Sequence, residues 1–284
     1  MKNLIVRTIS GTIFISIMIA AIWLPPYLFG IVFLLITILG LHEFYSLSDH
    51  IEGVKTGKTL SIASGAALFL GFFLLCFSGK LLGVTFSTIL FPVVSVYILS
   101  IICLFLFELF RNEKKPIQNI AISLMGHIYI ALPFGFICLM EMMDEMITLA
   151  FFFIIWASDT GAYLVGICIG KHKMFERVSP KKTWEGFFGG MIFALITGFI
   201  FCNVTEVSPD SENRLVLWQW LAFAVTVFVS GTLGDLVESL FKRYLNVKDS
   251  GSFMPGHGGL LDRFDSAIIA APVTFVFLIL CVVF

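Results

Sequence analysis

The stretch VTFSTILFPVVSVYILSIICLFLFELF, residues 84–110, contains a single charged side chain, Glu108. A helix needs about 20 predominantly apolar residues to cross the hydrocarbon core of a bilayer, so this stretch predicts a membrane span. Pro92 lies inside it, and we expect the helix to be kinked or tilted there. The segment indicates that lipid, rather than water, surrounds much of the chain.

The rest of the chain has the same apolar character. Of its 284 residues, 58% are hydrophobic and 13% are charged, and the mean hydropathy is +1.00. A soluble domain carries about 25% charged residues, so this composition excludes an ordinary water-soluble globular protein. The net charge of -1 gives no reason to expect a nucleic-acid partner. The predicted membrane spans are 8–25, 27–47, 59–78, 84–110, 117–140, 147–169, 185–203, 215–236 and 263–284.

These spans predict the fold class and the orientation. No alternation with a period of two residues indicates a β-barrel, so we predict an all-α polytopic membrane protein. About nine transmembrane helices would form one bundle, with residues 1–284 as a single integral membrane domain. Lysine and arginine are retained on the cytoplasmic side. Of the 18 such residues, only Lys80 and Arg214 fall on the side opposite the N-terminus, which is therefore expected to be cytoplasmic.

Two polar segments interrupt the apolar chain, and both are predicted to be cytoplasmic loops. The first, about residues 170–186, contains Ser179-Pro180-Lys181-Lys182-Thr183-Trp184-Glu185-Gly186. The second, about residues 234–265, reads GDLVESLFKRYLNVKDSGSFMPGHGGLLDRFD. Because polar positions are scarce elsewhere, we expect the chemistry of the protein to reside in these two loops.

The second loop carries two acidic pairs with the same spacing. Asp235 and Glu238 are three residues apart, which places them on one face of a helix, and Asp262 and Asp265 repeat this spacing. Two facing acidic pairs would repel each other without a cation between them. Mg²⁺ suits such a site, because it prefers oxygen ligands and usually also binds water or substrate phosphate. A lone Asp at a helix start, by contrast, is more often a cap than a ligand.

Between the acidic pairs lies a glycine-rich turn with basic neighbours. Pro255-Gly256-His257-Gly258-Gly259 cannot form a stable helix, and its backbone N–H groups could approach a phosphate closely. Lys242, Arg243 and Lys248 would supply positive charge to a polyphosphate. Topology alone also favours basic residues in a cytoplasmic loop, and many glycines serve only to make a turn. Their combination with the acidic pairs indicates phosphoryl or nucleotidyl transfer.

The second loop resembles the signature of phosphatidate cytidylyltransferases, also called CDP-diglyceride synthetases. The similarity covers S-L-F-K-R-x4-K-D-S-G-S-F-M-P-G-H-G-G-L-L-D-R-F-D, from Ser239 to Asp265, with the spacing intact. Met254 stands where the family pattern has Leu, Ile or Phe, a swap that conserves volume. The S-P-K-K-T-W-E-G segment is similar to the second hallmark of the family, and chain length and helix number also agree.

The resemblance implies transfer of CMP from CTP to phosphatidic acid, giving CDP-diacylglycerol and pyrophosphate in phospholipid biosynthesis. It implies a Mg²⁺ site at Asp235 and Asp262, to which we add Glu238, and a second, monovalent cation such as K⁺. The expected location is a bacterial inner membrane, with the active site facing the cytoplasm. We assign catalytic roles to Lys242, Arg243, Lys248, His257 and Asp265. We assign substrate binding to Asp159, Ser179, Lys181, Lys182, Gly258, Gly259 and Arg263.

Some assignments have plain structural alternatives. His257 either donates to a phosphate oxygen or merely ties the glycine loop together. Asp159 lies inside the sixth predicted span, where a carboxylate needs a partner, and we expect it to face the bundle interior near the loops. The alternative is a buried structural hydrogen bond. His42-Glu43, at the end of the second predicted span, is explained by interfacial solvation as well as by chemistry.

Small residues flank the first loop. Gly166-x3-Gly170 and Gly186-x3-Gly190 have a spacing that permits close helix packing or dimerisation. We favour close packing within the bundle, and a homodimer would agree with the family.

Two other functions use part of the same chemistry. A CTP-dependent lipid-alcohol kinase would share the needs for metal and triphosphate but not the full signature from Ser239 to Asp265. A membrane transporter would usually show paired halves and discontinuous helices, and the sequence contains no repeat. A CDP-alcohol phosphatidyltransferase is disfavoured, because no DGxxAR segment with spaced aspartates is present.

Overall fold

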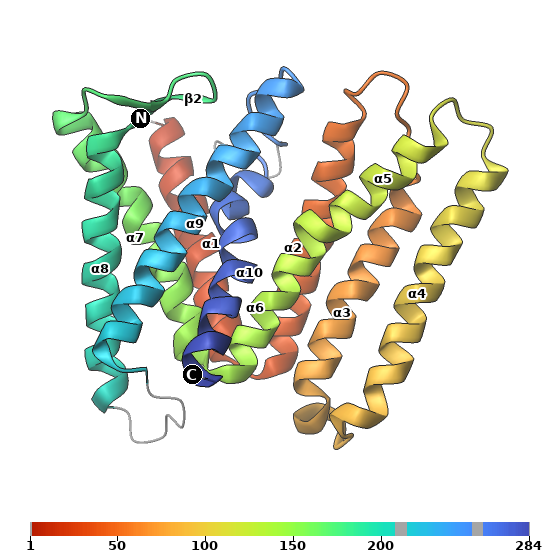
Figure 1. Cartoon of the computed structure of the whole chain (residues 1–284), viewed down its shortest axis with the longest axis horizontal. Coiled ribbons are helices and arrows are strands. Elements are labelled where there is room, and N and C mark those ends of the chain that lie inside the picture. Colours follow the sequence, from red (N-terminus) through yellow and green to blue (C-terminus); the bar gives the residue numbers. More distant parts are fainter. Residues whose placement is uncertain (1, 208–214, 252–257, 284) are drawn as a thin grey trace. The chain divides into compact units, whose positions relative to one another are not determined.

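The computed structural model describes residues 2–207, 215–251 and 258–283, and these residues are mostly helical (Figure 1). A π-helical turn, His127–Ala131, joins α5 (Pro116–Gly126) to α6 (Leu132–Met143). The helices are α1 (Lys2–Trp23), α2 (Pro26–Ser48), α3 (Lys58–Leu82), α4 (Phe86–Phe110), α5 (Pro116–Gly126), α6 (Leu132–Met143), α7 (Glu145–Ile169), α8 (Trp184–Val207), α9 (Leu217–Tyr244) and α10 (Leu261–Val283).

The membrane-spanning character is confirmed for most of the predicted spans. Among the described residues, 8 helical segments are long and apolar enough to cross a membrane, with α5, the π-turn and α6 counted as one. They correspond to all predicted spans except the first. That span, 8–25, is also helical: it lies largely within α1 (Lys2–Trp23), whose described part includes the apolar helix Thr8–Trp23.

The chain divides into two compact units. The first comprises Met1–Met142 and Leu245–Phe264, and the second comprises Met143–Tyr244 and Asp265–Phe284. The division falls after the first turn of α10. Residues up to Phe264 therefore belong to the first unit, and Asp265 belongs to the second.

In the first unit, α3 packs between α2 and α4 (Figure 1). Buried polar side chains link these helices to α5 and the π-turn. Tyr45 Oη donates to the Ser123 carbonyl at 2.7 Å, and Ser61 Oγ donates to Ser123 Oγ at 2.8 Å. The His127 ring lies 2.9 Å from the Ser61 carbonyl oxygen. Inside a bilayer such bonds satisfy polar groups that lipid could not.

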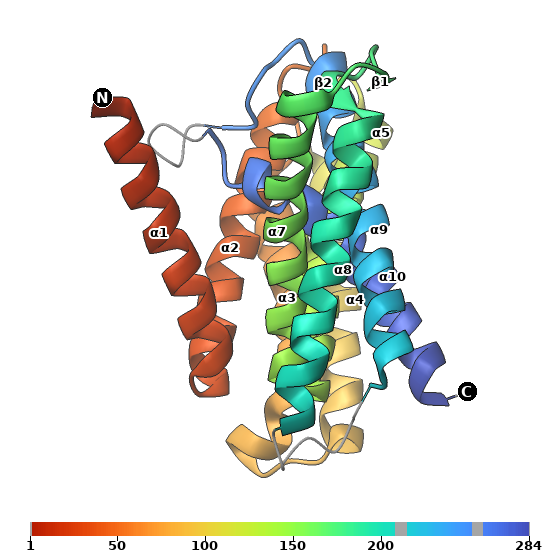
Figure 2. The same ribbon diagram turned by 90° about the vertical axis from the view of Figure 1, so that its left-hand side faces the viewer.

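In the second unit, α7 and α8 run side by side in both views (Figures 1 and 2). Glycines allow this close approach. A Cβ atom added at Gly186 would lie 2.8 Å from the Ala162 carbonyl oxygen and 3.4 Å from Gly166 Cα. A Cβ atom at Gly190 would lie 2.9 Å from the Ser158 carbonyl oxygen. The predicted use of these glycines for packing within the bundle is confirmed.

The first polar loop contains secondary structure that the sequence did not indicate. Strands β1 (Lys173–Phe175) and β2 (Ser179–Thr183) form an antiparallel hairpin, which lies at the ends of α7 and α8 (Figure 2). Val178 N–H donates to the Phe175 carbonyl at 3.2 Å and closes the turn. Lys173 pairs with Thr183 in the register, so the end of β2 leads directly into α8.

The second polar segment is more helical than expected. Helix α9 continues two turns beyond the predicted end of its span, to Tyr244. Asp235, Glu238 and Lys242 therefore lie on one continuous helix. Helix α10 begins at Leu261, with Asp262 in its first turn, as the acidic spacing had indicated.

Candidate active site

A pocket of about 620 Å³ opens within the second unit, among α7, the hairpin, α8 and α9. Its volume falls in the range of small-molecule sites, about 300–1,000 Å³. The charged side chains that line it are Asp159, Lys173, Lys181, Lys182 and Asp235. Its apolar wall includes Ala162, Tyr163, Ile167, Phe187 and Phe228. The pocket thus combines positive charge for phosphate with an apolar surface.

Asp235 is held by neighbours on both sides. Lys182 Nζ lies 2.6 Å from Asp235 Oδ2, and Ser239 Oγ donates to Asp235 Oδ1 at 3.2 Å. Each charged side chain of the ion pair is about one quarter exposed, so substrate could still reach it. The sequence assigned Lys182 to substrate and Asp235 to metal, and the structure brings the two together.

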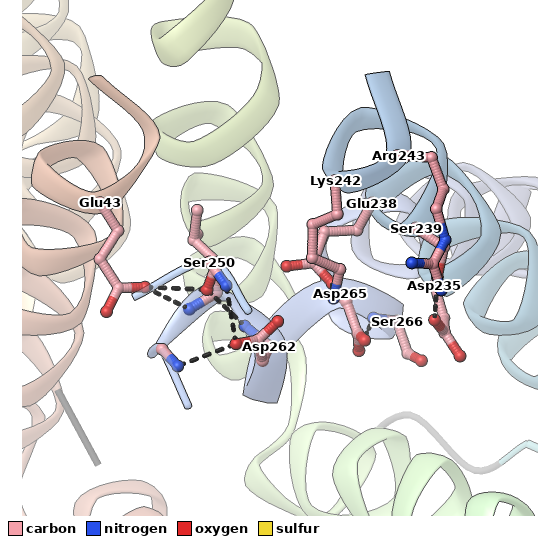
Figure 3. Close-up of polar contacts among 12 residues, drawn as sticks. Glu43, Asp235, Glu238, Ser239, Lys242, Arg243, Ser250, Asp262, Asp265 and Ser266 are labelled. Carbon is pink, nitrogen blue, oxygen red and sulfur yellow. Dashed lines mark hydrogen bonds and ion pairs between the residues drawn. The ribbon is translucent and has the colours of Figure 1, made fainter. Parts of the chain in front are cut away.

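Further carboxylates lie next to Asp235 (Figure 3). Glu238 is buried on α9, and Lys242 Nζ donates to its Oε2 atom at 2.9 Å. Asp265, at the start of α10, is close enough to Asp235, Glu238 and Asp159 for their negative charges to act on it. Asp235, Glu238 and Asp265 thus create a local excess of negative charge. Lys182 offsets the charge of Asp235, and Lys242 offsets that of Glu238.

The donor chemistry of this region suits Mg²⁺ without forming a complete cage. Among the residues described, no three His, Cys, Asp or Glu side chains are grouped as a closed metal site would require. Mg²⁺ is usually held by one or two carboxylates, with water and substrate phosphate as the other ligands. Asp235 lines the pocket and fits such a role. Asp262 belongs to the first unit, so its pairing with Asp235 stays a prediction.

The hairpin is tied to the helices on either side of it. Arg243 Nε on α9 donates to the Val178 carbonyl at 3.3 Å, in the turn of the hairpin. Glu185 on α8 accepts hydrogen bonds from the backbone N–H groups of Lys171 and His172, and its Oε1 lies 2.6 Å from His172 Nδ1. Glu185 thus links the first turn of α8 to the residues just before β1. These contacts fix the strand that presents Lys181 and Lys182.

Asp159 lines the same pocket as Lys181, Lys182 and Asp235. Its expected position near the first loop is confirmed. The residue is exposed, however, and does not face the bundle interior as expected. Its side chain is open to the pocket rather than enclosed by packing, which argues against a purely structural buried hydrogen bond.

In the first unit, Asp262 binds residues on the described flanks of the glycine-rich turn (Figure 3). Its Oδ2 atom accepts hydrogen bonds from Ser250 N–H at 3.0 Å and Gly259 N–H at 2.8 Å. Gly258 has a φ of 87°, a backbone conformation that favours glycine. A carboxylate has about four lone-pair sites, so these two bonds are compatible with a further ligand.

Glu43 belongs to this arrangement, although sequence reasoning gave it no role. It lies on α2 with 8% of its surface exposed, and its carboxylate accepts from Leu260 N–H at 2.8 Å and Leu261 N–H at 2.9 Å. The available signal was its position: an acidic residue at the end of an apolar span is costly unless it has partners.

The remaining predicted residues are dispersed. Ser179 is half-buried at the start of β2, and Lys248 and Arg263 are exposed in the first unit. His257 lies outside the described residues, so its assignment stays a prediction.

Comparison with known proteins identifies relatives of the chain. A family model described as the cytidylyltransferase family matches residues 5–281. A phosphatidate cytidylyltransferase of Staphylococcus saprophyticus is 39% identical over 175 residues, which is 61% of this chain and 64% of the relative. Proteins with the same name are 38% identical over 177 residues in Staphylococcus epidermidis and 39% identical over 177 residues in Staphylococcus aureus, with the same coverage. The match thus spans 64% of the length of these relatives.

Proposed function

The chain belongs to the cytidylyltransferase family, and on this premise we propose that it transfers CMP from CTP to phosphatidic acid, forming CDP-diacylglycerol and pyrophosphate. The family match favours this reaction over a CTP-dependent lipid-alcohol kinase or a transporter. The names of the staphylococcal relatives support phosphatidate as the acceptor.

The observation that carries the proposal is the composition of the pocket. Lys181, Lys182 and Asp235 lie beside the apolar side chains of Tyr163 and Ile167 on a membrane helix. A lipid with a phosphate headgroup needs both surfaces, because its phosphate requires cations and its acyl chains require an apolar boundary.

The reaction needs positioning and charge compensation more than proton transfer. A phosphate oxygen of the lipid is already ionised at neutral pH, so no strong general base is required. This oxygen forms a bond to the α-phosphorus of CTP while the bond from the α-phosphorus to the bridging oxygen breaks, and pyrophosphate leaves with that electron pair. Lys181 and Lys182 would lower the repulsion between the two anions and hold them in line.

The assignment of Mg²⁺ follows from the carboxylate oxygens available as ligands. Asp235 would hold Mg²⁺ together with substrate phosphate, and Asp262 and Glu238 are proposed as the further carboxylates. Mg²⁺ would supply charge neutralisation at the triphosphate. A second, monovalent cation such as K⁺ is part of the same proposal. The catalytic roles of Lys242, Arg243, Lys248, His257 and Asp265 stay predictions.

The proposed cellular location of the protein rests on its basic loop residues and on the bacterial source of its relatives. Lys171, Lys173, Lys181 and Lys182 all belong to the connection between α7 and α8, and basic connections are retained in the cytoplasm. The named relatives are bacterial, which supports a bacterial plasma membrane with the pocket facing the cytoplasm. A homodimer is part of the proposal as well.

Purified protein in detergent tests this function directly. We expect CTP and phosphatidic acid together, with Mg²⁺, to give CDP-diacylglycerol and an equal amount of pyrophosphate. Omission of either substrate should abolish both products. Pyrophosphate release without phosphatidic acid, or no lipid product from folded protein, would contradict the proposal.

A further inference from the structure

We propose that Glu43 is a positioning residue, whose buried carboxylate fixes the start of α10 and the described flanks of the glycine-rich motif, and through them the carboxylate of Asp262. This inference rests on the proposed function, because that function assigns substrate and metal binding to the motif. It names a residue of α2, more than 200 positions away in the sequence, as part of the machinery.

The contacts of Glu43 use both oxygens of its carboxylate. Oε1 accepts from Leu260 N–H, while Oε2 accepts from Leu261 N–H and from Ser250 Oγ at 3.2 Å. Leu260 and Leu261 are at the N-terminus of α10, where backbone N–H groups lack partners within the helix. A negative charge also interacts favourably with that end of the helix dipole. Figure 3 shows the Glu43 carboxylate directed toward Ser250.

Ser250 connects Glu43 to Asp262. Its hydroxyl donates to Glu43 and accepts from Asp262 N–H at 3.3 Å, while its own N–H donates to Asp262 Oδ2 at 3.0 Å. Gly259 N–H donates to the same Asp262 oxygen. Ser250 and Gly259 therefore approach each other, and two carboxylates hold this junction from opposite sides. A displaced Glu43 carboxylate would release Ser250 and with it the orientation of Asp262.

The glycines around Glu43 leave no spare room. A Cβ atom at Gly251 would lie 2.5 Å from Glu43 Oε1, and one at Gly259 would lie 2.6 Å from Oε2. Positions 251 and 259 thus both carry glycine where any side chain would push against the Glu43 carboxylate. This steric relationship gives a way to displace Glu43 without replacing it.

Glu43→Gln is the direct test. The amide keeps the size of the side chain, but its NH₂ group would face an N–H or O–H donor in place of an acceptor oxygen. Gly251→Ala is the second variant, because it retains Glu43 and moves its carboxylate. Glu52→Gln is the matched control, since Glu52 is an exposed carboxylate of the same unit.

We expect both test variants to lower kcat by about 10- to 100-fold, the usual effect of disturbing an outer-shell partner or shifting a site by about 1 Å. We also expect the KM for CTP to rise by several-fold, with Glu52→Gln unchanged. Loss of folded protein alone would lower the apparent kcat and leave the KM for CTP as it is. Unchanged kinetics, or a lower kcat with an unchanged KM, would overturn the proposal. Failure of both variants to fold would also overturn it, because Glu43 would then serve the fold itself.

Hydrogen exchange separates this inference from the proposed function. The Leu260 and Leu261 amides should exchange faster in Glu43→Gln and Gly251→Ala than in wild type or Glu52→Gln. This change is expected even if the wild-type protein has no cytidylyltransferase activity, in which case only the proposed function fails. Equal protection in all four proteins would show that Glu43 does not hold the start of α10.

Discussion

Lys182 Nζ lies 2.6 Å from Asp235 Oδ2, and this ion pair joins the hairpin to α9 beside the pocket. Each partner compensates the charge of the other before substrate arrives. An incoming triphosphate would compete with Asp235 for Lys182, and Mg²⁺ would compete with Lys182 for Asp235. The pair therefore places a cation-binding group and a phosphate-binding group side by side.

Asp235→Asn tests the acidic half of this pair. Asn keeps the shape of the side chain but removes the charge that attracts Lys182 and Mg²⁺, so kcat/KM for CTP should fall by about 100-fold, as for the loss of one transition-state electrostatic contact. The assay is CDP-diacylglycerol formation at saturating Mg²⁺. Glu176→Gln, at the exposed turn of the hairpin, is the control and should keep wild-type activity. Equal activity in Asp235→Asn and Glu176→Gln would remove Asp235 from the site.

Lys242→Met should destabilise the protein through Glu238. The side chain of Glu238 is 3% exposed, and the substitution takes away the ammonium group 2.9 Å from it. Breaking a buried ion pair costs about 3–5 kcal/mol, because one charge is left without that compensation. The double variant Glu238→Gln/Lys242→Met should recover much of the loss. Unfolding in detergent measures both; a double variant no more stable than Lys242→Met would count against the ion pair.

Gly186→Ala should separate α7 from α8. The added methyl group would lie 2.8 Å from the Ala162 carbonyl oxygen and 3.1 Å from Thr183 Oγ1. Overpacking of this kind costs about 1–3 kcal/mol. At Gly11 on α1 an added Cβ meets nothing within 4 Å, so Gly11→Ala should be neutral or slightly stabilising. The thermal unfolding temperature should therefore fall in Gly186→Ala but not in Gly11→Ala, and equal shifts would exclude a close glycine contact.

Asp144 is expected to make the stability of the folded protein depend on pH. It caps α7 by accepting from Met146 N–H at 2.7 Å, yet burial raises the pKa of its carboxyl group above the ordinary value of 3.8. A raised carboxyl pKa means that the folded state loses stability as pH rises from the ordinary pKa to the raised one. Asn caps helices as well as Asp and carries no charge. Asp144→Asn should therefore gain stability over wild type as pH rises through this window, with no gain below it.

Unfolding of Asp144→Asn and wild type from about pH 3.5 to pH 7 checks this sign. A stability difference that shrinks as pH rises would contradict the burial of this carboxyl group.

The sequence predicted the membrane helices because their apolar length is a local property. Asp235, Lys182 and Asp159 were also identified as candidates, since charges are rare in such a chain and stand out. Their meeting in one pocket depends on how α7, α8 and α9 pack, which no local pattern encodes. The hairpin was missed because both strands are short, and β2 is polar and contains a proline.

Glu43 was missed for a different reason. Its partners are backbone N–H groups of Leu260 and Leu261, whose side chains give no polar signal. A contact over this sequence distance is defined by tertiary structure alone. Solvation at the membrane interface was an adequate explanation until the burial of the carboxylate was known.

The central claim is that the α-phosphorus of CTP is the atom attacked, and CTP labelled at either the α- or the γ-phosphate tests it most directly. Purified protein would be incubated with phosphatidic acid and each labelled nucleotide, and label in the lipid phase would be counted. We expect the α-label to enter the lipid and the γ-label to leave as pyrophosphate. Transfer of the γ-label to lipid, with the α-label remaining in water-soluble nucleotide, would contradict cytidylyl transfer and indicate a lipid kinase.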